Sequence, residues 1–424
     1  MNRVVVTGIG FISPLGNTID KLTKNLKIGK NALNEISLFD NKNSKVKFAC
    51  QADINLEDFF SKKELRRMDR VSAFGILAAR DALKDSKLSK EEIKNASIII
   101  GTGIGGLTTI EEESEKANTK GYEKISPFFI PKSIANITSA MIAIDLGIHG
   151  YSSTSVTACA SSLTAILDAY RHIKDGYNNI VIVGGSEASI NRLGIFGFES
   201  MKALSTSDDI NRASIPFDKE RQGFVMGEGA GILVLEEYKQ AKKRKAKIYG
   251  EIIGAGATTD AYHITAPLES GEFAKKAMED ALASAKIDAT KIEYINAHGT
   301  STKLNDKVES KIYKELFTHA NISSTKSMTG HLLGASGALE AIISLIALDN
   351  NFIPPTINYK EKDDECPINI NIKSLDKNLT YVMTNSLGFG GHNVSVIFKK
   401  VKDEIWNRRN FKNSSPQISL CINR

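Results

Sequence analysis

Residues 156–185 read VTACASSLTAILDAYRHIKDGYNNIVIVGG and contain the kinds of segment on which the fold depends. A cysteine, Cys159, stands in a run of small residues that leads into a segment with helical spacing at 163–170. A continuously apolar segment follows at 179–185, and such a run is typical of a strand buried on both faces. The order of turn, helix and buried strand predicts an α/β protein.

The place of Cys159 at the start of a predicted helix indicates a nucleophile. Small neighbours let backbone and substrate approach the sulfur, and the amide N–H groups at a helix start lower a thiol's pKa and favour the thiolate. The alternative is a small buried cysteine that packs beneath the helix, which is the commoner fate of a lone cysteine. This stretch alone leaves the two interpretations about even.

Alternating strand and helix patterns extend over most of the chain. We expect strands at 3–7, 97–100, 179–185, 231–235, 248–256, 294–297, 381–385 and 394–399. We expect helices at 19–27, 70–83, 163–170, 238–247, 273–285, 307–317 and 339–348. Such alternation is typical of largely parallel, buried sheets. Gly8 and Gly10 predict a turn after the first strand, and the polar residues 403–424 predict a loosely attached extension.

Composition and charge are those of an ordinary globular protein. The chain has 424 residues, 42% of them hydrophobic and 25% charged, which is enough for a large core in two domains or halves. A net charge of +6 is too weak to indicate nucleic-acid binding but suits an acidic partner. The first residues form a strand-like run without the features of a signal peptide, and no stretch approaches a membrane span. We therefore expect a cytoplasmic protein that does not bind a membrane.

Two features that often indicate a bound metal or cofactor do not do so here. The four cysteines lie far apart and form no CxxC pair, so neither a zinc site nor a disulfide framework is expected, and a reducing compartment fits. Residues 101–106, GTGIGG, satisfy GxGxxG after a strand, but the next helix is acidic where a pyrophosphate needs positive or neutral surroundings. No acidic ribose ligand follows at the expected offset, so we interpret the segment as a tight glycine turn.

Later segments contain the groups that a cysteine nucleophile needs. Residues 296–302, NAHGTST, place His298 where a predicted strand ends, and α/β folds build their sites at the ends of parallel strands. Lys326 and His331 follow, and 385–393, NSLGFGGHN, form a glycine-rich turn able to direct backbone N–H groups toward a ligand. Each feature alone is more often structural. Their recurrence downstream of the cysteine favours an active site.

These segments resemble those of a known family. Residues 157–159 (TAC), 296–302, 325–334 (TKSMTGHLLG) and 385–393 resemble the β-ketoacyl-[acyl-carrier-protein] synthases of type II fatty acid synthesis, most closely the synthase II branch. Residues 124–129 (KISPFF) and 216–225 (PFDKERQGFV) are also similar to that family. The resemblance covers nearly the whole chain, from residue 3 to about residue 401.

The resemblance implies a thiolase-type α/β fold of two duplicated halves, in five α-β-α-β-α layers, and a homodimer. It places an N-terminal half at 1–250, a C-terminal half at 251–402 and the extension at 403–424. It implies an acyltransferase that needs no redox cofactor and works on acyl carrier protein. Cys159 accepts an acyl chain, malonyl-carrier protein loses carbon dioxide, and the resulting enolate attacks the thioester.

Catalytic roles follow from the same resemblance. Cys159 is the nucleophile, and its backbone N–H forms an oxyanion hole with that of Phe389, which also serves as a gate. His298 and His331 hydrogen-bond the malonyl thioester oxygen, a task that suits neutral imidazoles near pH 7. Lys326 and Glu340 support the histidines.

The resemblance also implies binding residues, which lie in less specific motifs than the catalytic ones. The substrate contacts are Phe198, Ile195, Thr108, Phe129 of the partner subunit, Thr300, Thr302, Gly388 and Gly390, with Phe196 as a further candidate for the pocket wall. The docking face for the acidic carrier protein consists of Lys62, Lys63, Arg66, Arg67, Lys124 and Lys202. Some relatives bind a structural monovalent cation near Asn296, Glu309, Asn385 and Ser386, and nothing in this sequence requires a metal.

Three positions depart from the family pattern. Lys303 stands where many relatives have proline, and His392 where threonine is frequent. Thr108 lies where a bulkier aliphatic residue often closes the acyl pocket, so the preferred chain length is open.

The rival enzymes are synthase I and a polyketide ketosynthase. Thiolase itself is disfavoured because it uses a second cysteine as base. A non-catalytic chain-length-factor subunit would lack the nucleophile, and a nucleotide-dependent oxidoreductase would use 101–106.

Overall fold

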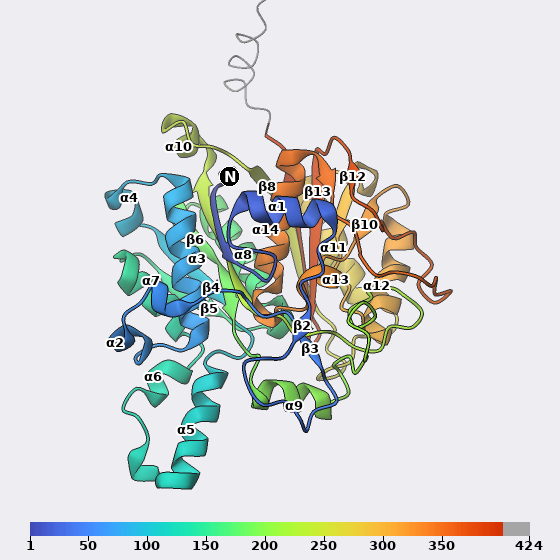
Figure 1. Cartoon of the computed structure of the whole chain (residues 1–424). Helices are drawn as coiled ribbons and strands as arrows, with labels where there is room; N and C mark the ends of the chain where they lie inside the picture. Colours follow the sequence, from blue (N-terminus) through green and yellow to red (C-terminus); the bar gives the residue numbers. More distant parts are fainter. Residues whose placement is uncertain (402–424) are drawn as a thin grey trace, which may run out of the picture.

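The structure is a computed structural model that describes residues 1–401, in which ten strands form one hydrogen-bonded sheet system (Figure 1). The predicted extension at 403–424 lies outside the described residues. The spatial order of the strands is β10-β9-β13-β14-β8-β1-β7-β6-β4-β5. Their bounds are β1 Val4–Ile12, β4 Ser97–Gly101, β5 Ser152–Ser155, β6 Ile180–Glu187, β7 Gly229–Glu237, β8 Gly250–Thr259, β9 Tyr294–Asn296, β10 Asn321–Ser323, β13 Tyr381–Gly388 and β14 His392–Lys399.

The strand order contains the same pattern twice. From its outer edge inward, the first set has the order β5-β4-β6-β7-β1, and the second set has the order β10-β9-β13-β14-β8. When the strands of each set are numbered along the chain, both orders are 3-2-4-5-1. The two sets meet where β1 pairs antiparallel with β8. The predicted duplication is therefore confirmed, while the boundary at residue 250 stays a prediction.

Helices occupy three layers around and between these strand sets (Figure 1). Apolar residues of α8 and α14 share the central core with both halves of the sheet system. Helices α3 and α7 pack on the outer face of the first half, and α11 and α12 on that of the second. This is the predicted five-layered α/β arrangement. The bounds are α3 Arg70–Ser86, α7 Ile137–Leu146, α8 Ser161–Lys174, α11 Glu272–Ala285, α12 Lys303–Leu316 and α14 Ser336–Asn350.

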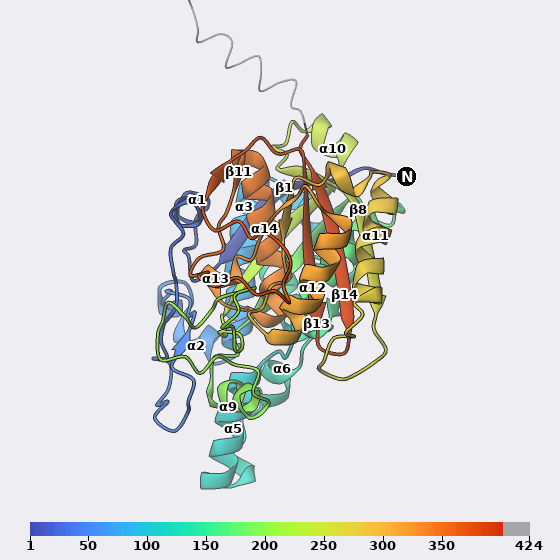
Figure 2. The same cartoon turned by 90° about the vertical axis from the view of Figure 1, so that its right-hand side faces the viewer.

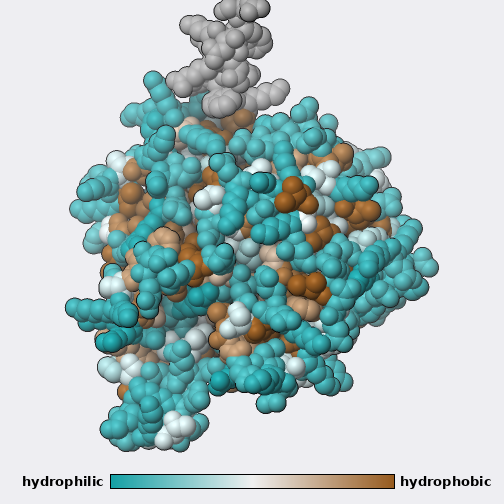
Figure 3. Space-filling model, viewed as in Figure 1, coloured by the Kyte–Doolittle hydropathy of each residue, from teal (hydrophilic) through white to brown (hydrophobic). Residues whose placement is uncertain are grey.

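The remaining elements are short or peripheral. Both views show α5 and α6 projecting from one end of the body, with α9 beside them in the second view (Figures 1 and 2). The face in Figure 3 is mostly hydrophilic, with small separate apolar patches. The bounds are α1 Ile19–Ile28, α2 Lys62–Leu65, α4 Lys90–Lys94, α5 Leu107–Lys120, α6 Phe129–Ser133, α9 Arg192–Ser200, α10 Tyr238–Lys243, α13 Lys326–Thr329, β2 Asn34–Glu35, β3 Phe48–Ala49, β11 Phe352–Ile353 and β12 Leu375–Asp376.

Two predictions about the strands were wrong. The sheets are mixed rather than largely parallel, because β1, β7, β8 and β14 all pair antiparallel with their neighbours. Strand β1 also continues through the turn expected at Gly8 and Gly10. A Cβ atom on either glycine would lie 2.2–2.5 Å from a carbonyl oxygen of α3, so these glycines permit close helix–strand packing instead of a turn.

Within residues 1–401, one helix is long and apolar enough to cross a membrane by length and composition, whereas the sequence predicted no stretch that approaches a membrane span. Residues Leu333–Asn350 satisfy that test, and 89% of this window is buried inside the structure. The sequence is apolar on all sides because α14 lies in the central layer, in contact with strands of both halves. The burial identifies a core helix.

Candidate active site

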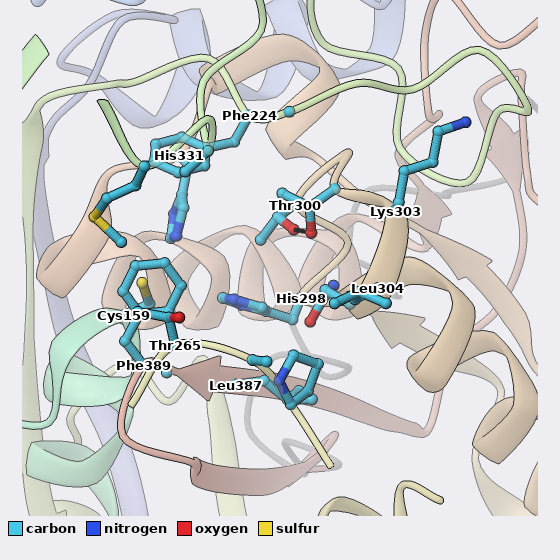
Figure 4. A pocket seen from close by; sticks show the side chains of 18 of the residues that line it. Cys159, Phe224, Thr265, His298, Thr300, Lys303, Leu304, His331, Leu387 and Phe389 are labelled. Carbon is cyan, nitrogen blue, oxygen red and sulfur yellow. Dashed lines mark hydrogen bonds between the residues drawn. The ribbon is translucent and has the colours of Figure 1, made fainter. Parts of the chain in front are cut away.

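Residues from both halves surround a cavity of about 320 Å³ (Figure 4). Cys159 of the first half shares it with His298, His331 and Phe389 of the second. The sequence-predicted residues that line the cavity are Cys159, Phe198, Lys202, His298, Thr300, Thr302, His331, Gly388 and Phe389. The site therefore forms only where the two halves meet.

The turn that carries Cys159 is held by local hydrogen bonds. Ala158 has the left-handed φ of 50°, and Ser161 Oγ donates to its carbonyl oxygen at 2.7 Å while accepting from the N–H of Thr157 at 2.9 Å. A Cβ atom on Gly388 would lie 2.6 Å from the carbonyl oxygen of Thr157. Small residues are needed here because a strand end of the second half touches the cysteine turn.

The repeat of the fold includes this turn. Leu333, in the 3₁₀ turn before α14, has φ 48°, and Ser336 has the same φ and ψ as Ser161, −53° and −51°. The second half thus reproduces the geometry of the cysteine turn with Gly334 in the middle. That copy lacks a nucleophile and instead positions His331, which lies two residues before Leu333.

The expectation of a lowered thiol pKa at the helix start was wrong for the free protein. Only 8% of Cys159 is exposed, and burial raises its pKa to about 11. The charge of Lys326 and the backbone N–H groups of Phe389 and Cys159 lower the pKa but do not outweigh burial. Cys159 is therefore a thiol at neutral pH, and the backbone N–H groups of Phe389 and Cys159 act on its sulfur to favour the charged form.

His298 and His331 lie in the same cavity with their ring centroids 5.3 Å apart (Figure 4). His298 follows β9, and the carboxylate of Glu309 accepts its backbone N–H at 2.7 Å. Nδ1 of His331 lies 2.9 Å from Oγ of Ser336. Burial and the charge of Lys326 lower the pKa of both rings well below the usual value, so both imidazoles are neutral at pH 7.

Lys326 and Glu340 form an ion pair behind the histidines. Their side chains are 1% and 3% exposed, and Nζ of Lys326 also donates to the carbonyl oxygen of His298 at 2.6 Å. The same Nζ lies 3.4 Å from Nδ1 of His298. Burial raises the pKa of Glu340 to about 7 against the opposing charge of Lys326. The pair therefore contacts a histidine but does not line the cavity within the described residues.

Phe389 lies on the turn between β13 and β14. Gly390 and Gly391 have φ angles of 85° and 77°, which favour glycine, and they close the turn. The Phe389 ring lies 6.4 Å from that of Phe198, centroid to centroid. Two aromatic rings thus stand together at the cysteine.

Several predicted contacts lie elsewhere. Among the residues that the structure describes, Ile195, Thr108 and Gly390 are not part of the cavity lining. Phe129 was expected to reach the pocket from the partner subunit, and that contact stays a prediction. Ile195 is buried in an apolar cluster that includes Phe198, whereas Thr108 accepts a hydrogen bond from Nδ2 of Asn191 at 3.0 Å. The exposed predicted docking residues are Lys62, Lys63, Arg66, Arg67, Lys124 and Lys202.

Sequence reasoning missed two residues that shape the site. Phe224 packs edge-on against His331, with the two ring centroids 5.1 Å apart. It lies in the segment 216–225, which resembles the family but was assigned no role in the site. Asp260 accepts a hydrogen bond from Nδ2 of Asn393 at 2.7 Å and thereby ties the loop after β8 to β14 near Phe389. No sequence signal distinguishes this aspartate from other loop carboxylates.

Buried oxygens without partners lie at the predicted cation position. Oδ1 of Asn296, Oδ1 of Asn385 and Oγ of Ser386 have no hydrogen-bond partner among the described residues. Asn296 pairs in register with Thr384 of β13, next to Asn385, so the groups belong to adjacent strands. Unpaired buried oxygens are rare, and hard cations take oxygen ligands. The donor set fits a monovalent cation.

Comparison with known proteins gives consistent similarities. Residues 1–241 match the family described as "Beta-ketoacyl synthase, N-terminal domain", and residues 249–360 match "Beta-ketoacyl synthase, C-terminal domain". A 3-oxoacyl-[acyl-carrier-protein] synthase 2 of Staphylococcus aureus (strain COL) is 44% identical over 406 residues, which cover 94% of this chain and 98% of that protein.

Solved structures show the same fold. A β-ketoacyl synthase from Burkholderia phymatum STM815 superposes with a TM-score of 0.89 at 33% identity, covering 95% of this chain and 100% of that one. A ketosynthase structure in complex with a type II polyketide synthase acyl-carrier protein gives a TM-score of 0.87 at 30% identity, covering 94% and 100%.

Proposed function

This chain belongs to the β-ketoacyl synthase family, and from that membership we propose that Cys159, His298 and His331 carry its reaction. The reaction is the decarboxylative Claisen condensation of fatty acid elongation, catalysed by an acyltransferase. An acyl thioester and a malonyl thioester give carbon dioxide and a 3-oxoacyl thioester two carbons longer. The following steps derive what each side chain contributes.

The first half-reaction transfers the acyl group to Cys159. The sulfur adds to the carbonyl carbon of the incoming thioester, the carrier sulfur leaves, and the cysteine proton ends on the carrier thiol. The backbone N–H groups of Cys159 and Phe389 stabilise negative charge on the cysteine sulfur and then on the tetrahedral oxygen. In other acyl-transfer enzymes, losing one such donor lowers the rate about 100- to 1,000-fold.

The second half-reaction uses the two neutral histidines. The malonyl thioester oxygen accepts N–H hydrogen bonds from His298 and His331, the carboxylate leaves as carbon dioxide, and its electron pair forms the enolate. The enolate carbon attacks the carbonyl carbon of the thioester on Cys159, the carbon–sulfur bond breaks, and the departing cysteine thiolate takes up a proton from solvent. Neutral donors suit this step because they stabilise developing charge without binding the malonyl carboxylate as an ion pair.

One observation carries this proposal: Cys159, with backbone N–H donors at its sulfur, shares one cavity with two neutral imidazoles. Replacing either histidine by alanine should leave acyl transfer to Cys159 measurable while release of carbon dioxide from malonyl-carrier protein falls about 100-fold or more. Single-turnover assays of each half-reaction test this. Unchanged carbon dioxide release in both variants would refute the role of the histidines.

Carrier proteins are acidic, and the exposed basic residues suit such a partner. Lys62, Lys63, Arg66 and Arg67 lie on and just after α2, with Arg67 over the ring of Phe128 at 5.5 Å. Lys202 lines the cavity itself. The similar ketosynthase in complex with its carrier protein supports this partner. Salt should weaken docking, because exposed charges are screened within about 10 Å at 0.1 M ionic strength.

A homodimer is the arrangement that the edge of the sheet supports. Strand β5 is the terminal strand of its half and pairs only with β4 in the described part of the chain. Ile144, Val156 and Tyr151 near this edge are 80%, 52% and 57% exposed. An open strand edge with apolar neighbours favours pairing with a second copy. Analytical ultracentrifugation of the wild type and Val156→Lys tests this arrangement.

The acyl chain is expected to enter the apolar cluster around Ile195 and Phe198. We propose that the pocket ends at Thr108 of the same subunit and at Phe129 of the partner subunit. Substituting Thr108 by isoleucine should shorten the longest accepted chain, as measured by the products of a mixed acyl-carrier assay. Unchanged product lengths would place the end of the pocket elsewhere.

We retain a monovalent cation near Asn296, Glu309, Asn385 and Ser386. Asn296, Asn385 and Ser386 offer unpartnered oxygens, whereas the Glu309 carboxylate already accepts the N–H groups of His298 and Gly299. When bound, the cation would supply positive charge and tie β13 to the strand that precedes His298. Potassium chloride should raise the melting temperature of the protein relative to the same concentration of choline chloride, because a ligand that binds the native state stabilises that state. Ser386→Ala should reduce that difference.

A cytoplasmic location and the halves 1–250 and 251–402 remain proposals. The free cysteines Cys50, Cys159 and Cys366 are buried and suit a reducing compartment. Expressing each half separately would test the domain division: if the halves do not fold alone, the shared central layer rather than the boundary defines the unit.

A further inference from the structure

Arg221 is a buried cation that none of the steps above uses. Its side chain has no exposed surface, and Asp363 forms an ion pair with its guanidinium. The same guanidinium donates to the carbonyl oxygens of Thr302 at 3.2 Å and Lys303 at 3.0 Å. Removing a charge from water is costly unless it is paired, so an arginine at this place requires a specific reason.

Asp306 holds the same turn through its backbone N–H groups. Its carboxylate accepts the N–H of Thr300 at 3.0 Å and that of Ser301 at 3.1 Å, and lies 3.7 Å from Nε of Arg221. Ser301 has a left-handed φ of 70°, which a non-glycine residue adopts only where its surroundings enforce it. Arg221 thus donates hydrogen bonds to carbonyl groups of the turn at 300–303, and Asp306 accepts hydrogen bonds from N–H groups of the same turn.

The turn presents a pair of hydroxyl groups to the cavity. Oγ1 of Thr300 and Oγ1 of Thr302 lie 2.9 Å apart, and both residues line the cavity. Thr300 is labelled in Figure 4. One hydroxyl donates to the other, so the pair keeps one O–H donor and free lone pairs. An amide group, with one donor and one acceptor, complements such a pair.

We propose that Arg221 is a positioning residue that sets the Thr300–Thr302 hydroxyl pair to bind an amide of the extended arm on which a carrier protein presents its thioester. The inference rests on the proposed function. Arginine suits this role because its planar fork serves several fixed acceptors at once, whereas lysine offers a single ammonium. The effect should therefore appear in substrate binding and should depend on the arm.

The test uses Arg221→Lys in the full chain, with an acyl-carrier thioester and with a short acyl thioester of ethanethiol that has no amide. With the carrier substrate, KM should rise about tenfold with kcat little changed, as expected when a hydrogen bond made equally in ground and transition states is lost. The ethanethiol substrate should react as with the wild type. The rate of alkylation of Cys159 by iodoacetamide should also be unchanged.

A double variant tests whether Arg221 acts through the threonines. If it does, adding Arg221→Lys to Thr302→Val should change KM less than twofold, since coupled residues are not additive. Arg212→Lys is the matched control: this arginine is also largely buried and pairs with Asp218 and Glu220, but it does not contact the turn. Its KM should equal that of the wild type.

Asp363→Asn provides a second route should Arg221→Lys fail to fold, and it should raise KM in the same direction. An unchanged KM in the folded variants, an equal loss with both substrates, or additivity with Thr302→Val would overturn the inference. A wild-type protein that forms no acyl adduct at Cys159 would refute the proposed function instead, so the two failures are distinguishable.

Discussion

Nζ of Lys326 lies 2.6 Å from the carbonyl oxygen of His298 and 3.4 Å from Nδ1 of the same residue. An ammonium group has donors only, so Nδ1 must accept and the ring proton must sit on Nε2. Since Lys326 is itself paired with Glu340, the tautomer of His298 is fixed from behind the cavity. Lys326 therefore acts on the reaction through the histidine.

Removing this ion pair should impair decarboxylation and spare acyl transfer. The double variant Lys326→Met with Glu340→Gln avoids leaving one unpaired buried charge, which by itself costs about 3–5 kcal/mol. We expect carbon dioxide release to fall about tenfold to 100-fold, because His298 then populates the wrong tautomer. Rapid-quench assays of the two half-reactions measure both effects. Equal losses in the two half-reactions would argue for general disruption.

The thiol pKa can be measured through alkylation. Because burial raises the pKa of Cys159 to about 11, the rate with iodoacetamide should increase about tenfold per pH unit through pH 9 without a plateau. Lys326→Met should move the curve to higher pH, since the lysine charge lowers this pKa. A plateau near pH 7 in the wild type would show that the helix start outweighs burial.

As the pH falls, His298 and His331 should become protonated at a lower pH than a free imidazole does. Burial lowers the pKa of His298 and His331 well below the usual value, so each stays neutral as the pH falls through 6.5. Decarboxylation should therefore keep its rate at pH 6 when stability is controlled by circular dichroism. Loss of activity with a midpoint at 6.5 or above would mean that a protonated histidine forms in the accessible range.

Two glycine substitutions should have opposite consequences. In Gly388→Ala, the new Cβ would lie 2.6 Å from the carbonyl oxygen of Thr157 and 3.3 Å from the backbone nitrogen of Cys159. Since this displaces an oxyanion donor, acyl transfer should fall about 100-fold. Gly197→Ala in α9 is the control, because its Cβ would meet no atom within 4 Å. It should gain roughly 0.5–1 kcal/mol of stability and keep its activity, as thermal unfolding would show.

Much of the fold could be predicted from the sequence. The apolar run at 180–187 and the helix after Cys159 lie close to their expected bounds, since burial imposes strong patterns there. The turn predicted at Gly8 and Gly10 is absent because these glycines serve a tertiary contact with α3. A single sequence does not distinguish such a contact from a turn. The antiparallel pairs of β7 and β8 with β1, of β6 with β7 and of β8 with β14 similarly depend on long connections whose direction no local pattern encodes. Only β13 and β14, among the antiparallel neighbours in the described sheet, are joined by a short turn.

The candidate site was predictable to the extent that its residues lie in distinctive motifs. His298 and His331 come from different segments of the second half, and only the fold shows that their rings lie 5.3 Å apart. The raised pKa of Cys159 was missed because the expectation considered the helix start without the burial around it. Arg221 and Asp306 were missed as site residues because their role lies in backbone contacts with a turn.

The most direct test of the central claim is the intact mass of the protein after incubation with a long-chain acyl-carrier protein, followed by peptide mapping. We predict an acyl adduct on Cys159 that disappears when malonyl-carrier protein is added, with release of a product two carbons longer. An adduct that malonyl-carrier protein cannot clear would contradict the roles of His298 and His331. The absence of any adduct on Cys159 would contradict its role as nucleophile and favour a non-catalytic binding subunit.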